Sequence, residues 1–144
     1  MNCAFCRIVT GEVEAEIVWR SEDAVAFLDH RPLFPGHVLL IPVQHIATLA
    51  DLPAPQVGPL FQTAQRLERA VEAALNADGS FIAINNNVSQ SVPHLHVHIV
   101  PRRKGDGLKG FFWPRRGYDG DEHLRETAAR IRAALSLAET EKAR

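Results

Sequence analysis

The sequence predicts an α+β fold, in which a five-stranded antiparallel sheet carries one long helix and a further helix follows near the C-terminus. Five short apolar segments, separated by turn residues, are typical of strands. One longer segment has its apolar residues at the spacing of a single helix face. A chain of 144 residues has the size of one domain, so we predict a single domain over residues 1–144 with its core in residues 3–102.

The first part of the chain is expected to begin with a short helical turn at residues 3–9. Strands are predicted at residues 17–19 and 24–28, because both segments are apolar and a polar turn separates them. A third strand is predicted at residues 37–42 and ends at Pro42, whose missing N–H interrupts a sheet ladder. We expect these three segments to be consecutive antiparallel strands.

The long helix is predicted at residues 55–77, where apolar residues recur three and four positions apart and polar residues fall largely elsewhere. Gly79 is expected to stop this helix. Two more strands are predicted at residues 81–84 and 94–100. The loop that joins them, residues 85–93, is polar and we expect it to be functional.

The charge balance and the short apolar runs restrict the class of protein. The chain has 16 lysines and arginines and 17 aspartates and glutamates, which argues against a protein built to coat nucleic acid or an anionic membrane. Its apolar runs are far shorter than the ~20 residues of a membrane span, and its N-terminus lacks the features of a signal peptide. We therefore expect a cytoplasmic protein without a membrane partner or a specific nucleic acid.

Two regions flank the predicted core. Cys3 and Cys6, spaced C-x-x-C, are more typical of a metal clip or a redox pair in that compartment than of a structural disulfide. The loop at residues 102–118 is basic, with a local charge of +5, so it is either a solvated loop or a means of attracting an anionic polyphosphate. Its run Phe111-Phe112-Trp113 suggests docking on a partner subunit, a base or the core. A C-terminal helix is predicted at residues 121–141.

The most informative segment contains three histidines at alternate positions. A strand's period of two places the histidines on one face and the apolar residues on the other: His94, His96 and His98 alternate with Leu95, Val97 and Ile99. Imidazoles packed in a row need partners when they are buried. Chemistry alone leaves two interpretations open, a multi-histidine metal site or a nucleophile with acid and base helpers.

Residues 94–100 fit the pattern H-φ-H-φ-H-φ-φ, which resembles the signature of the histidine triad family. The similarity extends upstream, where Phe27-Leu28-Asp29 and the segment from Pro35 to Pro42 resemble the family's strand, ribose-binding aspartate and fourth histidine, here His37. Gln90-Ser91-Val92 is also similar to the family. Together these segments cover most of residues 3–102, so the resemblance is more specific than three alternating histidines alone.

The resemblance implies a mechanism in which the middle histidine, here His96, attacks the α-phosphorus of a bound nucleotide. Water then hydrolyses the nucleotidyl-imidazole and releases a nucleoside monophosphate, most simply AMP. An imidazole is mainly neutral near pH 7, which suits a nucleophile. The other residues that the resemblance implies are the catalytic His98, His37 and Ser91, which hydrogen-bond to the phosphate or the leaving group, and the nucleotide-binding Phe27, Asp29, Asn85 and Gln90.

The start of the chain, Cys3-Ala4-Phe5-Cys6, resembles the C-x-F-C start of a bacterial, zinc-carrying subset of the family. The resemblance implies that His45 and His94 supply the other two ligands of a closed, structural zinc site that the chemistry does not require. The alternative is two reduced cysteines near a disordered terminus. In this assignment His94 is a ligand of the structural zinc, and His96 remains free of metal.

The sequence departs from the family pattern in the polar loop. Ser89 stands where a glycine is usual, and the loop before Gln90 is shorter than in many relatives. A glycine there lets backbone N–H groups approach a phosphate closely. The departure puts the positioning of the leaving group in doubt.

The substrate cues conflict, and two rival functions remain. Val100-Pro101-Arg102 resembles the dinucleoside-polyphosphate branch of the family, whereas Ser91 resembles the phosphoramidate branch. One rival is a zinc hydrolase with the three alternating histidines as ligands; the other is a nucleotide-binding adaptor whose histidines are catalytically idle. The resemblance also implies a homodimer.

Overall fold

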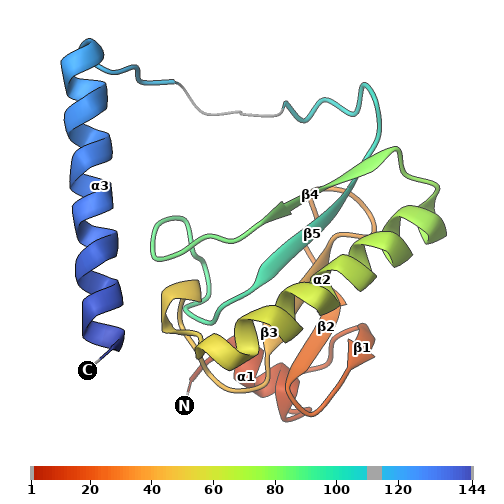
Figure 1. The fold of residues 1–144 in the computed structure, drawn as a ribbon. Coiled ribbons are helices and arrows are strands. Elements are labelled where there is room, and N and C mark those ends of the chain that lie inside the picture. Colours follow the sequence, from red (N-terminus) through yellow and green to blue (C-terminus); the bar gives the residue numbers. More distant parts are fainter. Residues whose placement is uncertain (1, 110–114, 144) are drawn as a thin grey trace. The chain divides into compact units, whose positions relative to one another are not determined.

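A computed structural model describes residues 2–109 and 115–143 of the chain. The chain divides into two compact units, Met1–Asp106 and Gly107–Arg144. The run Phe111-Phe112-Trp113, to which the sequence assigns a docking role, lies outside the described residues. Figure 1 shows the order of the elements along the chain.

The first unit is built on one five-stranded sheet. Every neighbouring pair of strands is antiparallel, and the order across the sheet is β1-β2-β3-β5-β4. The predicted five-stranded antiparallel sheet is therefore confirmed. The strands are β1 (Ile17–Arg20), β2 (Ala24–Leu28), β3 (Val38–Pro42), β4 (Gly79–Ala83) and β5 (Val97–Arg102).

Helix α2 (Ala54–Leu75) covers one face of this sheet (Figure 1). Its buried side chains include Leu60, Leu67 and Val71. They share a core cluster with the apolar residues that alternate with the histidines, Leu95, Val97 and Ile99, all of which are fully buried. The predicted division of residues 94–100 into an apolar face and a histidine face is therefore correct.

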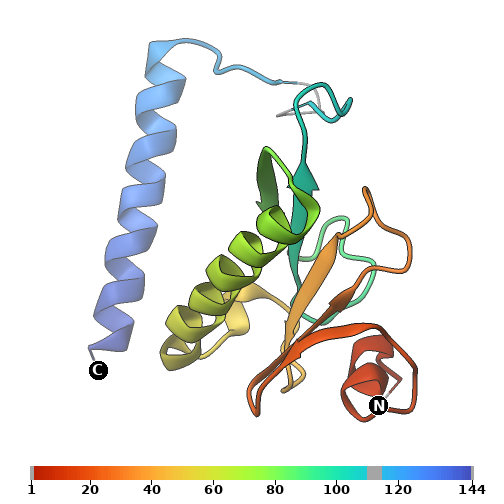
Figure 2. The ribbon, with the colours of Figure 1, turned by 90° about the vertical axis from the view of Figure 1, so that its right-hand side faces the viewer.

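Helix α1 (Ala4–Val9) lies on the opposite side of the sheet from α2 (Figure 2). Its Phe5 joins a second core cluster with Val25, Phe27, Leu39 and Ile41. These strand residues alternate with the residues beneath α2, because successive side chains of a strand point to opposite faces. The short helical turn predicted at residues 3–9 is confirmed.

The long helix was predicted to stop at Gly79, and that expectation is wrong. Asn76 ends α2 in the left-handed conformation, at φ 50° and ψ 47°, and asparagine tolerates this conformation better than most residues with a side chain. Gly79 instead begins β4. The strand follows the helix after a turn of only a few residues.

The last strand also begins later than predicted, at Val97 rather than His94. The backbone before it bonds outside the sheet ladder: the N–H of His94 donates to Val92 O at 2.8 Å, and the N–H of Leu95 donates to Ile46 O at 2.6 Å. The extended segment nevertheless keeps its alternation. His94 and His96 both contact Phe5, on the face that carries α1.

A short 3-10 helix, η1 (Leu49–Asp51), precedes α2 and was not predicted. Thr48 and Asp51 form a reciprocal capping box at its start, in which each side chain accepts from the other residue's backbone N–H. Ser or Thr followed three residues later by an acidic residue is the sequence signal that could have revealed it.

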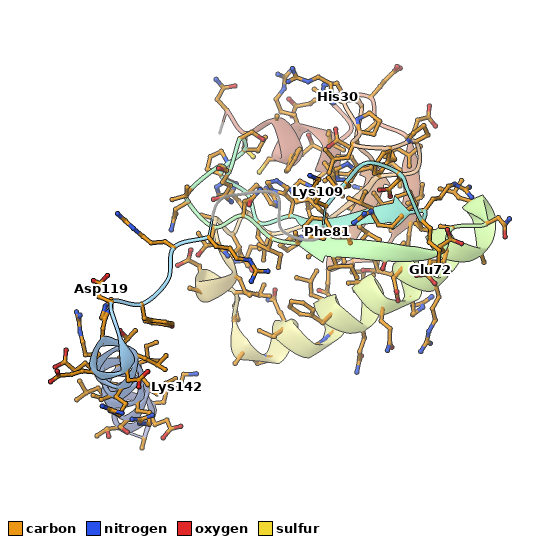
Figure 3. The ribbon with its side chains drawn as sticks, turned by 90° about the horizontal axis from the view of Figure 1, so that it is seen from above. His30, Glu72, Phe81, Lys109, Asp119 and Lys142 are labelled. Atoms are coloured by element: carbon orange, nitrogen blue, oxygen red, sulfur yellow. The ribbon has the colours of Figure 1, made fainter. Side chains whose placement is uncertain are left out.

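The second unit contains α3 (Asp121–Lys142), as predicted for residues 121–141 to within one residue. Asp121 and Glu122 lie in its first turn and Lys142 in its last, which matches the charges that a helix dipole favours at its two ends. None of its residues is buried, and Figure 3 shows its side chains radiating on every side. Among the described residues, no helix is both long and apolar enough to cross a membrane.

Candidate functional site

Four histidines gather on the α1 face of the sheet, where strands β3 and β5 meet. Leu39 of β3 lies opposite His98 of β5 in the ladder. His37, two residues before Leu39, is therefore a diagonal neighbour of His98 on the same face. The rings of His96 and His98 lie 4.9 Å apart, and those of His37 and His98 5.2 Å apart. Strand pairing thus brings the fourth histidine to the other three.

The ring of His96 is held by a backbone carbonyl. Its Nδ1 lies 2.6 Å from the carbonyl oxygen of His94, and a carbonyl only accepts, so Nδ1 carries the proton. Nε2 therefore keeps its lone pair, and within the described residues it has no hydrogen-bond partner. The side chain is buried, with only 3% of the residue exposed. This is the protonation state that a nucleophilic imidazole needs.

His37 and His98 form a directed chain of hydrogen bonds. The backbone N–H of Leu33 donates to His37 Nδ1 at 3.1 Å, so the ring proton of neutral His37 is on Nε2. That Nε2–H donates to His98 Nδ1 at 2.9 Å, which in turn places the proton of His98 on Nε2. Nε2 of His98 is buried and has no partner among the described residues. The chain thus ends in an N–H donor available to a ligand.

Burial keeps these two rings neutral. Burial, together with the neighbouring His96 and His37, lowers the pKa of His98 from 6.5 to about 4. Burial also lowers the pKa of His37, against the opposing effect of the Asp29 carboxylate, whose Oδ2 lies 3.8 Å from His37 Nδ1. At neutral pH, the donor and acceptor directions of the chain are therefore fixed.

Phe27 lies in β2, and Asp29 directly follows the strand, beside His37. Asp29 Oδ1 accepts from the backbone N–H of Arg31 at 2.9 Å, so one oxygen serves a local turn and the other lies toward His37. Phe27 is 3% exposed, and its ring centroid lies 5.4 Å from that of Phe5. Phe27 therefore offers little surface to a ligand and mainly supports the histidine face.

The polar loop between β4 and the histidines is fastened by amide side chains. Gln90 Nε2 donates to Ala47 O at 2.6 Å, and Gln90 Oε1 accepts from the backbone N–H of Asn87 at 2.9 Å. Asn86 Oδ1 accepts from the backbone N–H of Leu49 at 2.8 Å. The side-chain amide of Gln90, which the resemblance assigns to nucleotide binding, is engaged within the protein.

The remaining predicted loop residues face solvent. Asn85 and Ser91 are exposed, and their side chains form no hydrogen bond with the part of the chain that the structure describes. Ser89 has φ 58°, the left-handed region that glycine adopts without cost. The position where the sequence departs from the family pattern is therefore one where the backbone itself favours glycine.

A second cluster, defined by Cys3, Cys6, His45 and His94, lies next to the first. Its four ligand atoms lie within 4.8 Å of one another. Cys6 Sγ is 3.3 Å from His45 Nδ1, and His94 Nδ1 is 3.6 Å from Cys3 Sγ and 3.7 Å from Cys6 Sγ. Tetrahedral zinc, with Zn–S of about 2.3 Å and Zn–N of about 2.0 Å, needs ligand separations of this size.

The orientation of His94 fits a metal ligand. Its Nε2 lies 2.8 Å from the carbonyl oxygen of Pro42, so Nε2 carries the proton and Nδ1 directs its lone pair at the two thiols. The residue is fully buried. The Cys3, Cys6, His45 and His94 side chains are thus arranged as the four ligands that the resemblance implies, with no ligand position left for a substrate.

Asp29, His37 and His98 also lie close enough to be considered as a metal site. Their orientation does not suit one, because His37 Nδ1 accepts from Leu33 and His37 Nε2 donates to His98. Neither nitrogen of His37 has a lone pair to spare. Of the two clusters, only the one with sulfur ligands fits a metal ion.

Arg102 and Arg103, the first cations of the basic loop, form bonds within the folded chain. Arg102 pairs with Asp106 at 2.6 Å, and the Arg103 guanidinium donates to the carbonyls of Leu75 and Asn76 at the end of α2. A cation is favourable at a helix C-terminus. Attraction of a polyphosphate by this loop stays a prediction.

The sequence reasoning missed the part that Phe5 plays in the site. The Phe5 ring contacts those of His96, His94 and Phe27, at 5.1, 6.0 and 5.4 Å between centroids. Its place between the two cysteines of the C-x-F-C segment is the signal that could have found it.

Comparison with known proteins places these observations in context. A model of the HIT domain matches residues 10–105. An uncharacterized HIT-like protein of Mycobacterium tuberculosis is 38% identical over 110 residues, which are 75% of this chain and 76% of that protein. A bis(5'-adenosyl)-triphosphatase of Dictyostelium discoideum is 37% identical over 95 residues, 65% of this chain and 64% of the enzyme.

Among solved structures, a zinc-bound histidine triad family protein from Mycobacterium smegmatis is similar to this chain. It is 39% identical and superposes with a TM-score of 0.71, covering 93% of this chain and 98% of that protein.

Proposed function

The chain belongs to the HIT domain family, and on that premise we propose that it cleaves the α-phosphate bond of adenosine polyphosphates or nucleoside phosphoramidates through a nucleotidylated His96. The observation that carries the proposal is the 2.6 Å contact of His96 Nδ1 with the His94 carbonyl, which leaves the Nε2 lone pair available. The family includes nucleotide hydrolases, such as the Dictyostelium relative.

In the first step, His96 Nε2 attacks the α-phosphorus, so that an N–P bond forms while the bond from phosphorus to the leaving group breaks. The ring acquires positive charge, and the Nδ1–H donated to the His94 carbonyl stabilises it. The leaving group departs with the bonding electron pair. The exposed hydroxyl of Ser91 is the group we assign to protonating or hydrogen-bonding it.

The Nε2–H of His98 supplies a hydrogen bond to the phosphate as its negative charge shifts. This donor is buried and unpartnered among the described residues, so it is preorganised for an anionic oxygen. In the second step, water attacks the phosphorus, the N–P bond breaks, and AMP leaves with His96 restored. No step requires a metal ion.

The geometry refines the role of His37, which the resemblance places on the phosphate. Both of its ring nitrogens are bonded within the chain, to Leu33 and His98. We therefore assign His37 to positioning: it fixes the tautomer of His98 and keeps the ring proton of His98 on Nε2. Asp29, with one oxygen not used in its local turn, remains the residue we propose for the ribose hydroxyls.

For the metal centre, we propose structural zinc held by Cys3, Cys6, His45 and His94. The ligand separations suit a tetrahedral ion, and the relative from Mycobacterium smegmatis is zinc-bound. When bound, zinc supplies a cross-link between the N-terminal helix and the sheet.

The rival zinc-hydrolase interpretation, with His94, His96 and His98 as ligands, has less support. In the described residues, no candidate metal group contains all three. His96 Nδ1 and His94 Nε2 are both used on backbone carbonyls, and their remaining nitrogens serve different clusters. An idle nucleotide-binding adaptor is left as the alternative.

We also propose a homodimer. Strand β4 is an edge strand, and Ile82 on it and Phe61 on α2 are 41% and 40% exposed. Light scattering at several protein concentrations tests this proposal, and a mass of one chain throughout would contradict it.

The function is tested by following nucleotide release from adenosine phosphoramidate, diadenosine triphosphate and diadenosine tetraphosphate. Wild type and His96→Ala are compared, each with and without a chelator. We expect AMP from wild type even with the chelator and none from the variant, and the preferred substrate identifies the branch of the family. Reversible loss of turnover on chelation, or wild-type turnover by His96→Ala, would establish the metal interpretation instead; a folded wild type without turnover would favour the adaptor.

A further inference from the structure

We propose that Phe5 is a positioning residue for the nucleophile: its ring, held between Cys3 and Cys6, sets the orientation of His96. The proposal rests on the proposed function of His96 and adds to it a residue outside the matched domain, which spans residues 10–105.

Phe5 is 8% exposed and meets His96 nearly at a right angle. The centroids of the two rings lie 5.1 Å apart and their planes make an angle of 87°. Edge-to-face contacts in this range are directional, because a ring's positive edge meets its neighbour's negative face. Rotation of the imidazole about its bond to Cβ would lose this contact.

His96 needs such a restraint, because the hydrogen bond of its Nδ1 does not fix the plane of the ring completely. The bond from Nδ1 to the His94 carbonyl fixes which nitrogen is protonated. The direction of the Nε2 lone pair also depends on the tilt of the ring, which the packed rings of Phe5 and His98 limit. In-line attack on phosphorus is sensitive to this direction, since misplacement by about 1 Å can cost about 100-fold in rate.

The position of Phe5 is itself set by the metal cluster. Helix α1 has only six residues, too few to be stable without tertiary contacts. Cys3 and Cys6 tie it to His94 and His45 on both sides of Phe5. The Phe5 ring also contacts His94 at 6.0 Å. The cluster therefore restrains the ring of His96 in two ways, through the contact with the Phe5 ring and through the hydrogen bond to the His94 carbonyl.

The test compares Phe5→Leu with Ile8→Ala, both as zinc-loaded proteins. Ile8 is a matched control, because it lies on the same helix and packs on the same core cluster without a ring contact to His96. Phe5→Leu is expected to lower kcat about 10- to 100-fold with a less than about threefold change in KM. Ile8→Ala is expected to keep wild-type kcat.

The second readout needs no substrate. A ring that rotates away from the His94 carbonyl loses the bond that fixes its tautomer. Long-range proton–nitrogen spectra report the His96 tautomer, so we expect the Nδ1–H form in wild type and Ile8→Ala but a mixture in Phe5→Leu. This result would support the positioning role even if the protein proved to be an adaptor, so the two proposals can fail separately. Should Phe5→Leu not fold, Phe5→Met gives the same comparison.

An unchanged His96 tautomer together with wild-type kcat in Phe5→Leu would overturn the proposal. So would an equal loss of kcat in Ile8→Ala, because the effect would then belong to helix α1 as a whole rather than to the ring of Phe5.

Discussion

Two clusters share the α1 face of the sheet and meet at His94. In the cluster of Cys3, Cys6, His45 and His94, the ligand atoms converge within 4.8 Å. In the cluster of His37, His96 and His98, the nitrogens instead form donor and acceptor pairs, and within the described residues one lone pair and one N–H are left without a partner. Both clusters contain histidines, and the chemistry of those histidines differs.

The difference between His94 and His96 follows from which ring nitrogen bonds to a backbone carbonyl. The Pro42 carbonyl engages Nε2 of His94 and leaves Nδ1 for a metal. The His94 carbonyl engages Nδ1 of His96 and leaves Nε2 for phosphorus. Histidines two residues apart thus present opposite nitrogens, and the role of each follows from the nitrogen that remains.

The largest effects should separate the two clusters. His96→Ala is expected to lower kcat by at least about 1,000-fold, because it removes the nucleophile, and to keep one zinc per chain. His45→Ala is expected to lose the zinc and to lower the unfolding midpoint in urea, because metal binding contributes to folding. We expect its kcat to fall about 10- to 100-fold, because the cluster positions His96 only indirectly. Steady-state kinetics and metal analysis on both variants make the comparison.

A kcat as low in His45→Ala as in His96→Ala, measured where both are folded, would contradict the separation. Loss of zinc from His96→Ala would also contradict the separation, because His96 is not one of the proposed zinc ligands. Circular dichroism of each variant at the assay temperature is the control for folding.

Much of the fold was predictable because the spacing of apolar residues along the sequence reflects which side chains are buried. The continuous apolar runs of β2 and β3 reflect strands buried on both faces, and the helical spacing of α2 reflects one buried face. The start of β5 was missed by three residues because Leu95 bonds to Ile46, a contact distant in sequence. Asn76 replaced Gly79 as the helix end, a choice between two residues that both tolerate the left-handed turn.

The sequence could predict which residues form the site, but not the direction of the hydrogen bonds between them. Alternation explains why His96 and His98 share a face, and the resemblance added His37, Cys3 and Cys6. The direction of each hydrogen bond depends on backbone groups such as the N–H of Leu33 and the carbonyl of Pro42. Such contacts carry no side-chain signature, because every residue type presents the same carbonyl.

The next largest effect distinguishes the two ends of the hydrogen-bond chain. His98→Ala removes the buried donor and is expected to lower kcat about 100- to 10,000-fold. His37→Ala leaves that donor in place but frees its tautomer, so a loss of about 10- to 100-fold is expected. Equal losses in the two variants, measured with the same substrate, would contradict the positioning role of His37.

The pH dependence of the free energy of unfolding tests whether His98 is neutral in the folded protein. The pKa of His98 is lowered from 6.5 to about 4 by burial, so between these values the unfolded chain binds a proton that the folded chain does not. The free energy of unfolding is therefore expected to fall as pH decreases from about 6.5 to about 4. Urea titrations at several pH values measure it.

His98→Asn removes this titration and should make the decrease shallower than in wild type. Both proteins are compared with the same added zinc, so that metal release at low pH affects both alike. Parallel curves for the two proteins would show that His98 is not the group responsible.

The smallest effect concerns the loop beside the clusters. Ser89 has φ 58°, so Ser89→Gly is expected to raise the free energy of unfolding by about 0.5–1 kcal/mol. Asn87→Gly is the matched control: its φ is 65°, but asparagine tolerates this region and a smaller gain is expected. Chemical denaturation measures both, and a destabilised Ser89→Gly would show that the serine side chain contributes more than the turn costs.

The central claim is that His96 becomes nucleotidylated while His94 serves the metal. Its most direct test is to mix excess wild-type protein with substrate, quench in alkali, where a phosphorus–nitrogen bond to imidazole survives, and map the adduct by peptide mass spectrometry. We predict one nucleoside monophosphate attached to His96 and none in His96→Ala. Turnover with no adduct, or an adduct on His94 or His98, would contradict the account.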